Sequence, residues 1–191
     1  MGKIVVTEFV SVDGVIEDPG GAEDYEHGGW SLQIDRGEDG ARFKFDETMA
    51  SDALLLGRVT YQGFAEAWPS REGEFADRFN TMPKFVVSTT LDKAAWNNST
   101  IIRGDVAAEV GKLKQQFAND IAVHGSAQLV NTLKELDLVD EYRLMVFPVV
   151  LGKGKRLFSD SGDLTPLELA EAKPVGPVGV MVLTYRRAAQ G

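Results

Sequence analysis

The sequence predicts an α/β fold: a three-layer sandwich around a mostly parallel mixed sheet, with antiparallel strands at its C-terminal end. Two observations lead to this prediction. Strand-like and helix-like segments alternate through the first three quarters of the chain, and strand-like segments dominate the remainder. The 191 residues, 43% of them hydrophobic, can bury a sizeable core, and no linker or internal repeat divides them. We therefore expect a single domain over residues 1–191.

The predicted strands are short apolar runs, many of them rich in β-branched side chains and ended by turn residues. They cover residues 3–12, 53–56, 84–88, 101–102, 121–124, 142–150, 167–172 and 178–187. Pro148 lies inside the sixth run. It suggests a bulge or a sheet edge there, because proline cannot donate to a strand ladder.

The predicted helices cover residues 41–50, 59–66, 75–80, 106–117 and 129–136, where apolar residues recur at helical spacing. Asp105 is a suitable N-cap for the fourth helix. Residues 17–40 are polar, acidic and rich in glycine, and we interpret them as a long loop of the kind that often covers a binding site. We expect the acidic residues of this loop to form a solvated surface.

Composition excludes several classes of function. The formal net charge of −9 makes the chain a poor partner for nucleic acid, which binds through phosphate neutralisation. The absence of cysteine excludes disulfides, thiol catalysis and cysteine-held metals, and two histidines are too few for a multi-histidine site, so we expect no metal. No targeting segment and no membrane-length apolar run is visible, so a cytoplasmic protein is expected.

Three strand ends carry small residues and hydroxyls: residues 57–60, 88–90 and 124–127. In open α/β sheets, ligands lie outside the carboxyl ends of the strands. Gly57 permits a sharp turn, the following helix N-terminus favours phosphate, and the guanidinium of Arg58 suits a pair of phosphate oxygens. Each signal alone also fits an ordinary turn, and no Gly-x-Gly-x-x-Gly follows the first strand. Together they favour a dinucleotide site.

These residues carry a family resemblance. Residues 54–61, Leu-Leu-Leu-Gly-Arg-Val-Thr-Tyr, resemble the Gly-Arg-x-Thr motif of dihydrofolate reductases, and residues 123–129 resemble their second glycine motif. Residues 12–16 and 147–154 are more similar to the C-terminal reductase domain of the bifunctional riboflavin-biosynthesis protein and its stand-alone relatives. The resemblance covers nearly the whole chain, in the expected order.

The resemblance implies a dihydrofolate-reductase-like fold that binds NADPH. It places the following residues on cofactor-contacting motifs: Gly57, Arg58, Val59, Thr60, Ser88, Thr89, Thr90, Gly125, Ser126, Ala127, Gln128 and Leu129. The implied activity is NADPH-dependent reduction of a small heterocycle, most like 5-amino-6-(5-phosphoribosylamino)uracil reductase. A pteridine or dihydrofolate-type reductase and a non-catalytic nucleotide-binding dimeric module are the alternatives. The resemblance also implies a homodimer, for which the apolar strand at 142–150 is a weak hint.

One departure from the family pattern argues against dihydrofolate reduction. Dihydrofolate reductases carry an acid on the first helix, and the corresponding position here is Ala41, with Asp39 and Asp46 out of register. Deaminase activity is excluded because the chain lacks the cysteines that a zinc deaminase needs.

Four residues are candidates for contact with the substrate. Asp13, just after the first strand, is the candidate catalytic residue, as an acid or as an anchor for an aminopyrimidine ring; alternatively it caps its own turn. Trp30 is placed to close over the substrate, or else simply anchors the long loop. Lys153 and Lys155 lie in a basic loop that suits a substrate phosphate, or that forms a solvated hairpin.

Overall fold

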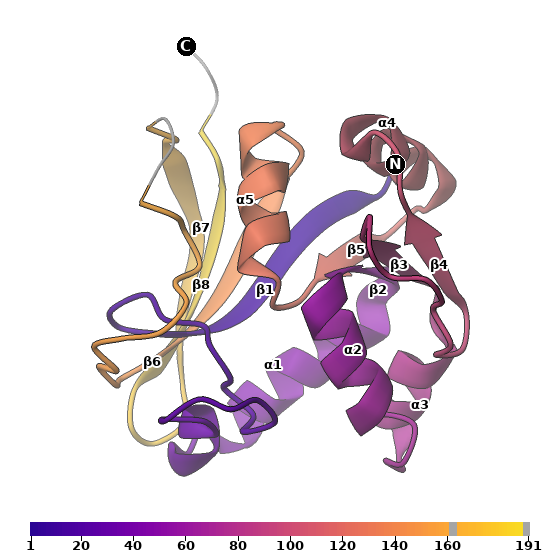
Figure 1. Cartoon of the computed structure of the whole chain (residues 1–191). Coiled ribbons are helices and arrows are strands. Elements are labelled where there is room, and N and C mark those ends of the chain that lie inside the picture. The colour runs from indigo at the N-terminus through magenta and orange to yellow at the C-terminus, as the bar shows by residue number, and fades with distance from the viewer. Residues whose placement is uncertain (161–163, 189–191) are drawn as a thin grey trace.

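In the computed structural model, which describes residues 1–160 and 164–188, eight strands form one sheet in the order β4-β3-β2-β5-β1-β6-β8-β7 (Figure 1). The strands are β1 (Lys3–Ser11), β2 (Ser51–Gly57), β3 (Lys84–Val87), β4 (Ser99–Ile102), β5 (Asp120–Val123), β6 (Glu141–Phe147), β7 (Leu167–Val175) and β8 (Val180–Arg187). The strands from β4 to β6 in this order pair in parallel, and β8 pairs antiparallel with β6 and β7. The predicted mixed sheet is confirmed.

Helices cover both faces of the sheet, which confirms the predicted three layers. The helices are α1 (Gly37–Ala50), α2 (Arg58–Ala67), α3 (Glu74–Thr81), α4 (Val106–Gln116) and α5 (Ala127–Glu135), with a short 3-10 helix, η1 (Trp30–Gln33). One core cluster joins α4 and α5 to alternate residues of β1, β2 and β5, such as Val6 and Leu55. Two further clusters join the opposite face to α2 and α3, and to the region of α1.

Two predicted boundaries were wrong, each for a local reason. Strand β6 ends at Phe147, so Pro148 follows the strand and makes no bulge within it. The chain turns there because the N–H of Val149 bonds back to the Phe147 carbonyl at 2.8 Å. Helix α1 begins at Gly37, inside the segment predicted as loop, where the Asp35 side chain accepts a hydrogen bond from the Gly37 N–H.

The parallel strands bring the predicted strand ends to one edge of the sheet. Strand β2 lies between β3 and β5, and β5 lies between β2 and β1. Their carboxyl ends therefore open on the same rim, which is where an open α/β sheet binds ligands. Among the described residues, no helix is long and apolar enough to cross a membrane.

Candidate active site

Two helix N-termini lie at the centre of this rim. Helix α2 follows β2 directly after Gly57, and α5 follows the end of β5 after Ser126. No side chain caps either helix, whereas Asp105 caps α4 through the N–H groups of Ala107 and Ala108, as predicted. The first N–H groups of a helix have no partner within it and carry the positive end of the helix dipole. Both N-termini are thus suited to bind an anion.

Hydrogen bonds join the two N-termini. The N–H of Gly57 donates to the Ser126 hydroxyl at 2.9 Å, and that hydroxyl donates to the Thr60 hydroxyl at 2.8 Å. A Cβ atom on Gly57 would lie 2.9 Å from Ser126 Oγ, and one on Gly125 would lie 2.7 Å from Thr60 Oγ1. Gly125 also has a φ of +55°, in the left-handed region that favours glycine. The close approach therefore requires glycine at both positions.

The third strand end lies beside this pair but uses its hydroxyl internally. Ser88 Oγ accepts hydrogen bonds from the N–H groups of Thr90 and Leu91. The guanidinium of Arg103 donates hydrogen bonds to the carbonyls of Thr89 and Leu91. These bonds hold the loop that follows β3. The side chains of Thr89 and Thr90 are exposed.

The side chains around the two N-termini differ in what they can offer a ligand. Arg58 and Val59 are exposed, and Arg58 donates to its helix neighbour Gln62 at 3.0 Å. Arg58 has no acidic partner in the described part of the chain. Gln128 is exposed, but Leu129 is buried in the core, so Leu129 can contribute only backbone groups to the rim.

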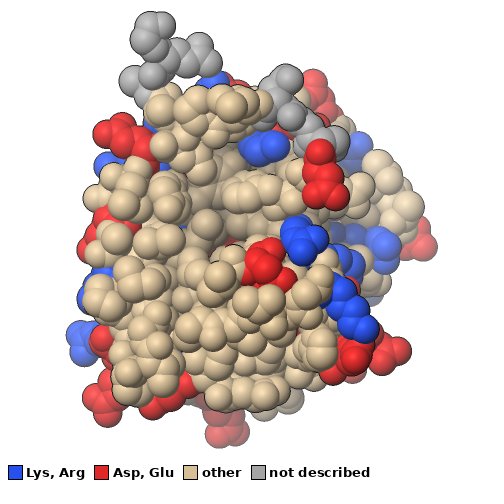
Figure 2. Space-filling model, turned by 90° about the vertical axis from the view of Figure 1, so that its left-hand side faces the viewer, with Lys and Arg blue, Asp and Glu red and all other residues tan. Residues whose placement is uncertain are grey.

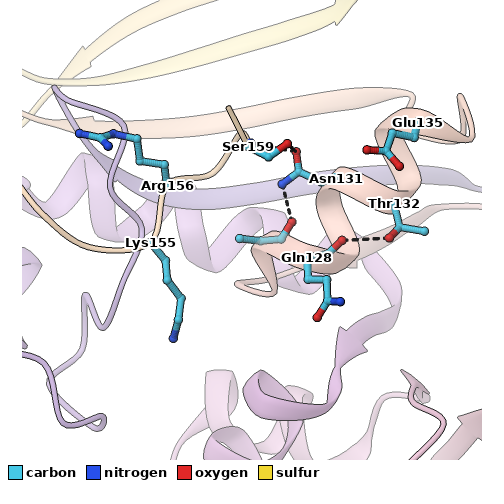
Figure 3. Close-up of a pocket in the computed structure, with 8 residues that line it drawn as sticks. Gln128, Asn131, Thr132, Glu135, Lys155, Arg156 and Ser159 are labelled. Atoms are coloured by element: carbon cyan, nitrogen blue, oxygen red, sulfur yellow. Dashed lines mark hydrogen bonds between the residues drawn. The ribbon is translucent and has the colours of Figure 1, made fainter. Parts of the chain in front are cut away.

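A groove of about 440 Å³ runs along α5 from its first turn. Figure 3 shows the side chains of Gln128 and Lys155 projecting into the same space, one from α5 and the other from the loop after β6. Asn131 also lines the groove, and its side-chain amide donates hydrogen bonds to the carbonyls of Ala127 and Leu157. The full lining is Ala127, Gln128, Asn131, Thr132, Glu135, Lys155, Arg156 and Ser159.

Asp13 ties two loops together. Its carboxylate accepts hydrogen bonds from the Ser11 hydroxyl at 2.7 Å and from the N–H groups of Leu151 and Gly152 at 3.1 and 2.8 Å. The bond from Ser11 is the largest effect on its pKa, and together these bonds lower it to about 2, although partial burial opposes them. An ionised carboxylate cannot supply a proton at neutral pH. These contacts match the turn-anchoring interpretation.

Trp30 is an anchor for the long loop in this structure. The side chain is 3% exposed, donates to the Glu17 carbonyl at 2.8 Å and packs edge-on against Phe147. The indole N–H is therefore already used, and its ring belongs to the core beside β6.

The basic loop pairs with the acidic loop, a contact that the sequence analysis missed. Lys153 pairs with Glu26, and Lys155 pairs with Glu17 at 3.1 Å and lies 3.7 Å from Glu23. The acidic residues are thus more than a solvated surface: three of them neutralise two lysines that were expected to face a substrate phosphate. Arg156 makes no ion pair with any described residue, and its Nε donates to the Asp13 carbonyl at 3.1 Å.

A buried charged cluster beneath the rim was also missed. On α1, Lys44 contacts the Thr7 hydroxyl at 2.5 Å and Glu47 at 2.6 Å, and Thr7 donates to Glu47 at 2.8 Å. Burial opposes the charge on Glu47, but Lys44 and these hydrogen bonds hold its pKa below the usual value. Helix α1 therefore does present an inward acid, in the form of an ion pair. Burial among Phe64 and Phe79 lowers the pKa of nearby His124 to about 3, so its imidazole is neutral.

The fold and the paired N-termini define a class of protein, the α/β sandwiches of the dihydrofolate reductase type. Dihydrofolate reductase from Enterococcus faecalis, complexed with NADP(H) and RAB-propyl, superposes with a TM-score of 0.62 at 15% identity, covering 98% of both chains. A putative riboflavin biosynthesis protein from Shewanella sp. PV-4 superposes with a TM-score of 0.78 at 19% identity, covering 98% of this chain and 99% of that one.

The sequence narrows the class to one family. The chain belongs to the RibD C-terminal domain family, whose model matches residues 2–181. The protein YyaP of Bacillus subtilis (strain 168) is 29% identical over 188 residues, which cover 96% of this chain and 94% of YyaP. The resemblance inferred from residues 12–16, 54–61, 123–129 and 147–154 is confirmed at the level of family and fold.

Proposed function

We propose that the protein is an NADPH-dependent reductase of a small heterocycle. The observation that carries the proposal is the pair of uncapped helix N-termini at one rim, held together by Gly57, Ser126 and Thr60. Membership of the RibD C-terminal domain family supports the same reading. NADPH supplies a hydride when bound, and the chain's task is to bind, orient and shield it.

The rim residues fit a pyrophosphate. The first N–H groups of α2 and α5, including those of Val59, Thr60, Gln128 and Leu129, would donate to its oxygens. Gly125 lets the turn before α5 lie close against Thr60 of α2, because a Cβ atom at position 125 would lie 2.7 Å from Thr60 Oγ1. Arg58, exposed and without an acidic partner among the described residues, would bind a further phosphate. Thr89 and Thr90 would border the adenosine side.

The substrate side is proposed from Asp13, Lys153 and Lys155, of which Lys155 lines the 440 Å³ groove. Asp13 would accept a hydrogen bond from an amino group of the heterocycle, without donating a proton. Lys155, and Lys153 at the outer end of its loop, would have to leave Glu17 and Glu26 to meet a substrate phosphate. Trp30 would support the loop without touching the substrate. An aminopyrimidine with a ribose phosphate fits this set of groups, and a pterin is the alternative.

The direct test is turnover of the purified protein with NADPH and candidate acceptors, namely an aminopyrimidine ribose phosphate, dihydropterin and dihydrofolate. Loss of the reduced-nicotinamide absorbance with the aminopyrimidine is expected, and Arg58→Ala should raise the KM for NADPH. NADPH binding without turnover of any acceptor would favour the alternative function, that of a non-catalytic nucleotide-binding module. No NADPH binding would overturn the proposal.

We propose that the working unit is a homodimer formed through the C-terminal strands. Strand β7 is the last in the sheet order, so no described strand pairs with its outer edge. Leu169, within β7, is 52% exposed, and Leu164, just before the strand in sequence, is 89% exposed. Figure 2 shows that the side bearing these strands is largely uncharged, with most charges near its margins. Sedimentation should give twice the chain mass, and Leu169→Lys should shift it to the monomer.

A further inference from the structure

Glu8 is a buried acid that is not among the residues assigned to the proposed coenzyme and substrate sites. It lies in the middle of β1 and is 6% exposed. Side chains alternate along a strand, and Val6 and Val10 belong to the core cluster that packs against α4 and α5. The Glu8 side chain therefore points to the α5 face, whereas Thr7 points to α1. This places the Glu8 carboxyl inside the core, beneath the end of β5.

The carboxyl supports the rim from below. Strand β1 pairs in parallel with β5, with Val6 beside Val123, so the same register places Glu8 beside Gly125, whose backbone N–H favours the charged form of the Glu8 carboxyl. Within the described residues, Glu8 Oε1 is buried without a hydrogen-bond partner. Burial raises the pKa of Glu8 to about 8, against the opposing effects of Lys44 and the Gly125 N–H, while Glu47 adds to the rise. Glu8 is thus mainly neutral near pH 7, directly under the turn that leads into α5.

The surrounding charges do not neutralise an ionised Glu8. From α1, Lys44 is the nearest cation, but Glu47 and Thr7 already hold it. From the end of β5, His124 carries no charge at neutral pH. From β6, Arg143 is shared among Glu47, Asp120 and Glu141. The first turn of α5 carries Ala127, Gln128 and Leu129, none of which titrates.

We propose that Glu8 is a positioning residue for the coenzyme, which holds the Gly125–Ser126 turn in its protonated form and so couples binding of a pyrophosphate at that turn to retention of a proton. The inference rests on the proposed function, because it takes the phosphates of NADPH as the anion. A neutral carboxyl beneath the turn leaves the N–H groups above it to the phosphates. A carboxylate there would repel them across a dry interior, where charges are poorly screened.

Linkage sets the size and direction of the effect. Below pH 8, Glu8 keeps its proton in the free and the bound protein, so affinity is constant. Above pH 8, the free protein loses the proton that the bound protein retains, so affinity falls as pH rises. The dissociation constant for NADPH should rise about tenfold between pH 7 and pH 9 if the bound form keeps its proton throughout.

The test measures NADPH affinity by fluorescence titration from pH 7 to pH 9 in the wild type, Glu8→Gln and Glu109→Gln. Glutamine keeps an acceptor for the Gly125 N–H but cannot ionise. Glu109, in the first turn of α4, has its carboxylate paired with Lys112 and is the matched control for the loss of a glutamate charge. The expected result is a tenfold rise in the wild type and in Glu109→Gln, and a flat profile in Glu8→Gln. Lys84, whose pKa burial also lowers to about 8, is tested in parallel as Lys84→Met.

The wild type alone also tests the role of Glu8, even if Glu8→Gln does not fold. Calorimetry at pH 8.5 in two buffers of different ionisation enthalpy reports the protons taken up on binding, and uptake of more than half a proton per NADPH is expected. Tight binding with no uptake and a flat wild-type profile would overturn the role of Glu8 while leaving the reductase proposal intact. A pH dependence that persists in Glu8→Gln but vanishes in Lys84→Met would overturn it in the same way. Absence of NADPH binding at every pH would overturn both.

Discussion

Gly125→Ala tests the requirement for glycine at the meeting point of α2 and α5. The variant should be destabilised for two separable reasons. An alanine at the φ of +55° costs about 1–2 kcal/mol relative to glycine. The new Cβ would lie 2.7 Å from Thr60 Oγ1 and 3.0 Å from its Cγ2, so Thr60 must move and lose its hydrogen bond with Ser126. That loss adds about 1 kcal/mol, for a total of about 2–3 kcal/mol.

Urea unfolding of a double-mutant cycle separates the two contributions. In a Thr60→Ala background the clash disappears, so Gly125→Ala should cost only the backbone strain of about 1–2 kcal/mol. Gly111→Ala is the matched control, because no atom lies within 4 Å of its Cβ position in α4. That substitution should be neutral or stabilise by up to about 1 kcal/mol. Equal costs for Gly125→Ala in both backgrounds, or a cost below about 0.5 kcal/mol, would refute the close approach of the two turns.

Three further predictions concern single side chains. Arg58→Ala should weaken NADPH binding about tenfold at low salt without changing the urea midpoint, while Arg42→Ala on α1, already paired with Asp46, should leave binding unchanged; equal losses in both would contradict a specific phosphate contact. Asp13→Asn should lower the free energy of unfolding by about 1 kcal/mol after allowance for solvent screening. Because the pKa of Asp13 in the folded protein is lowered to about 2, this contribution is present above pH 4 and is lost as the pH falls toward 2. A variant that unfolds like the wild type at pH 6 would count against the role of Asp13 as an anchor. Glu8→Gln should flatten the pH dependence of stability: a raised carboxyl pKa means that the folded wild type binds more protons than the unfolded chain between about pH 4.5 and 8, so its stability falls across that window, and parallel profiles would show that Glu8 titrates normally.

The rim was predictable because its signals are local in the sequence. A glycine directly after a short apolar strand and before a helix marks each turn, and parallel strands bring such turns to one edge. Gly57, Thr60 and Ser126 do meet there. The sequence could not show how tightly the turns interlock, because that depends on the register of β2 against β5.

The buried acids were missed because burial is decided by distant packing. Thr7 and Glu8 interrupt the apolar run from Ile4 to Val10, and whether each side chain faces the core or the solvent depends on α1 and α5. The partners of Asp13 and Lys155 come likewise from loops far along the chain. Local pattern fits a turn and a site equally well at Asp13. Its distant partners, Leu151 and Gly152, argue against a proton-donating role and favour that of an anchor.

A crystal structure of the protein soaked with NADPH is the most direct measurement of the central claim. The account predicts pyrophosphate oxygens within hydrogen-bond distance of the first N–H groups of both α2 and α5, with Gly125 against the coenzyme and Arg58 turned toward a phosphate. Coenzyme density at millimolar NADPH that lies elsewhere, or that touches only one of the two helices, would contradict it.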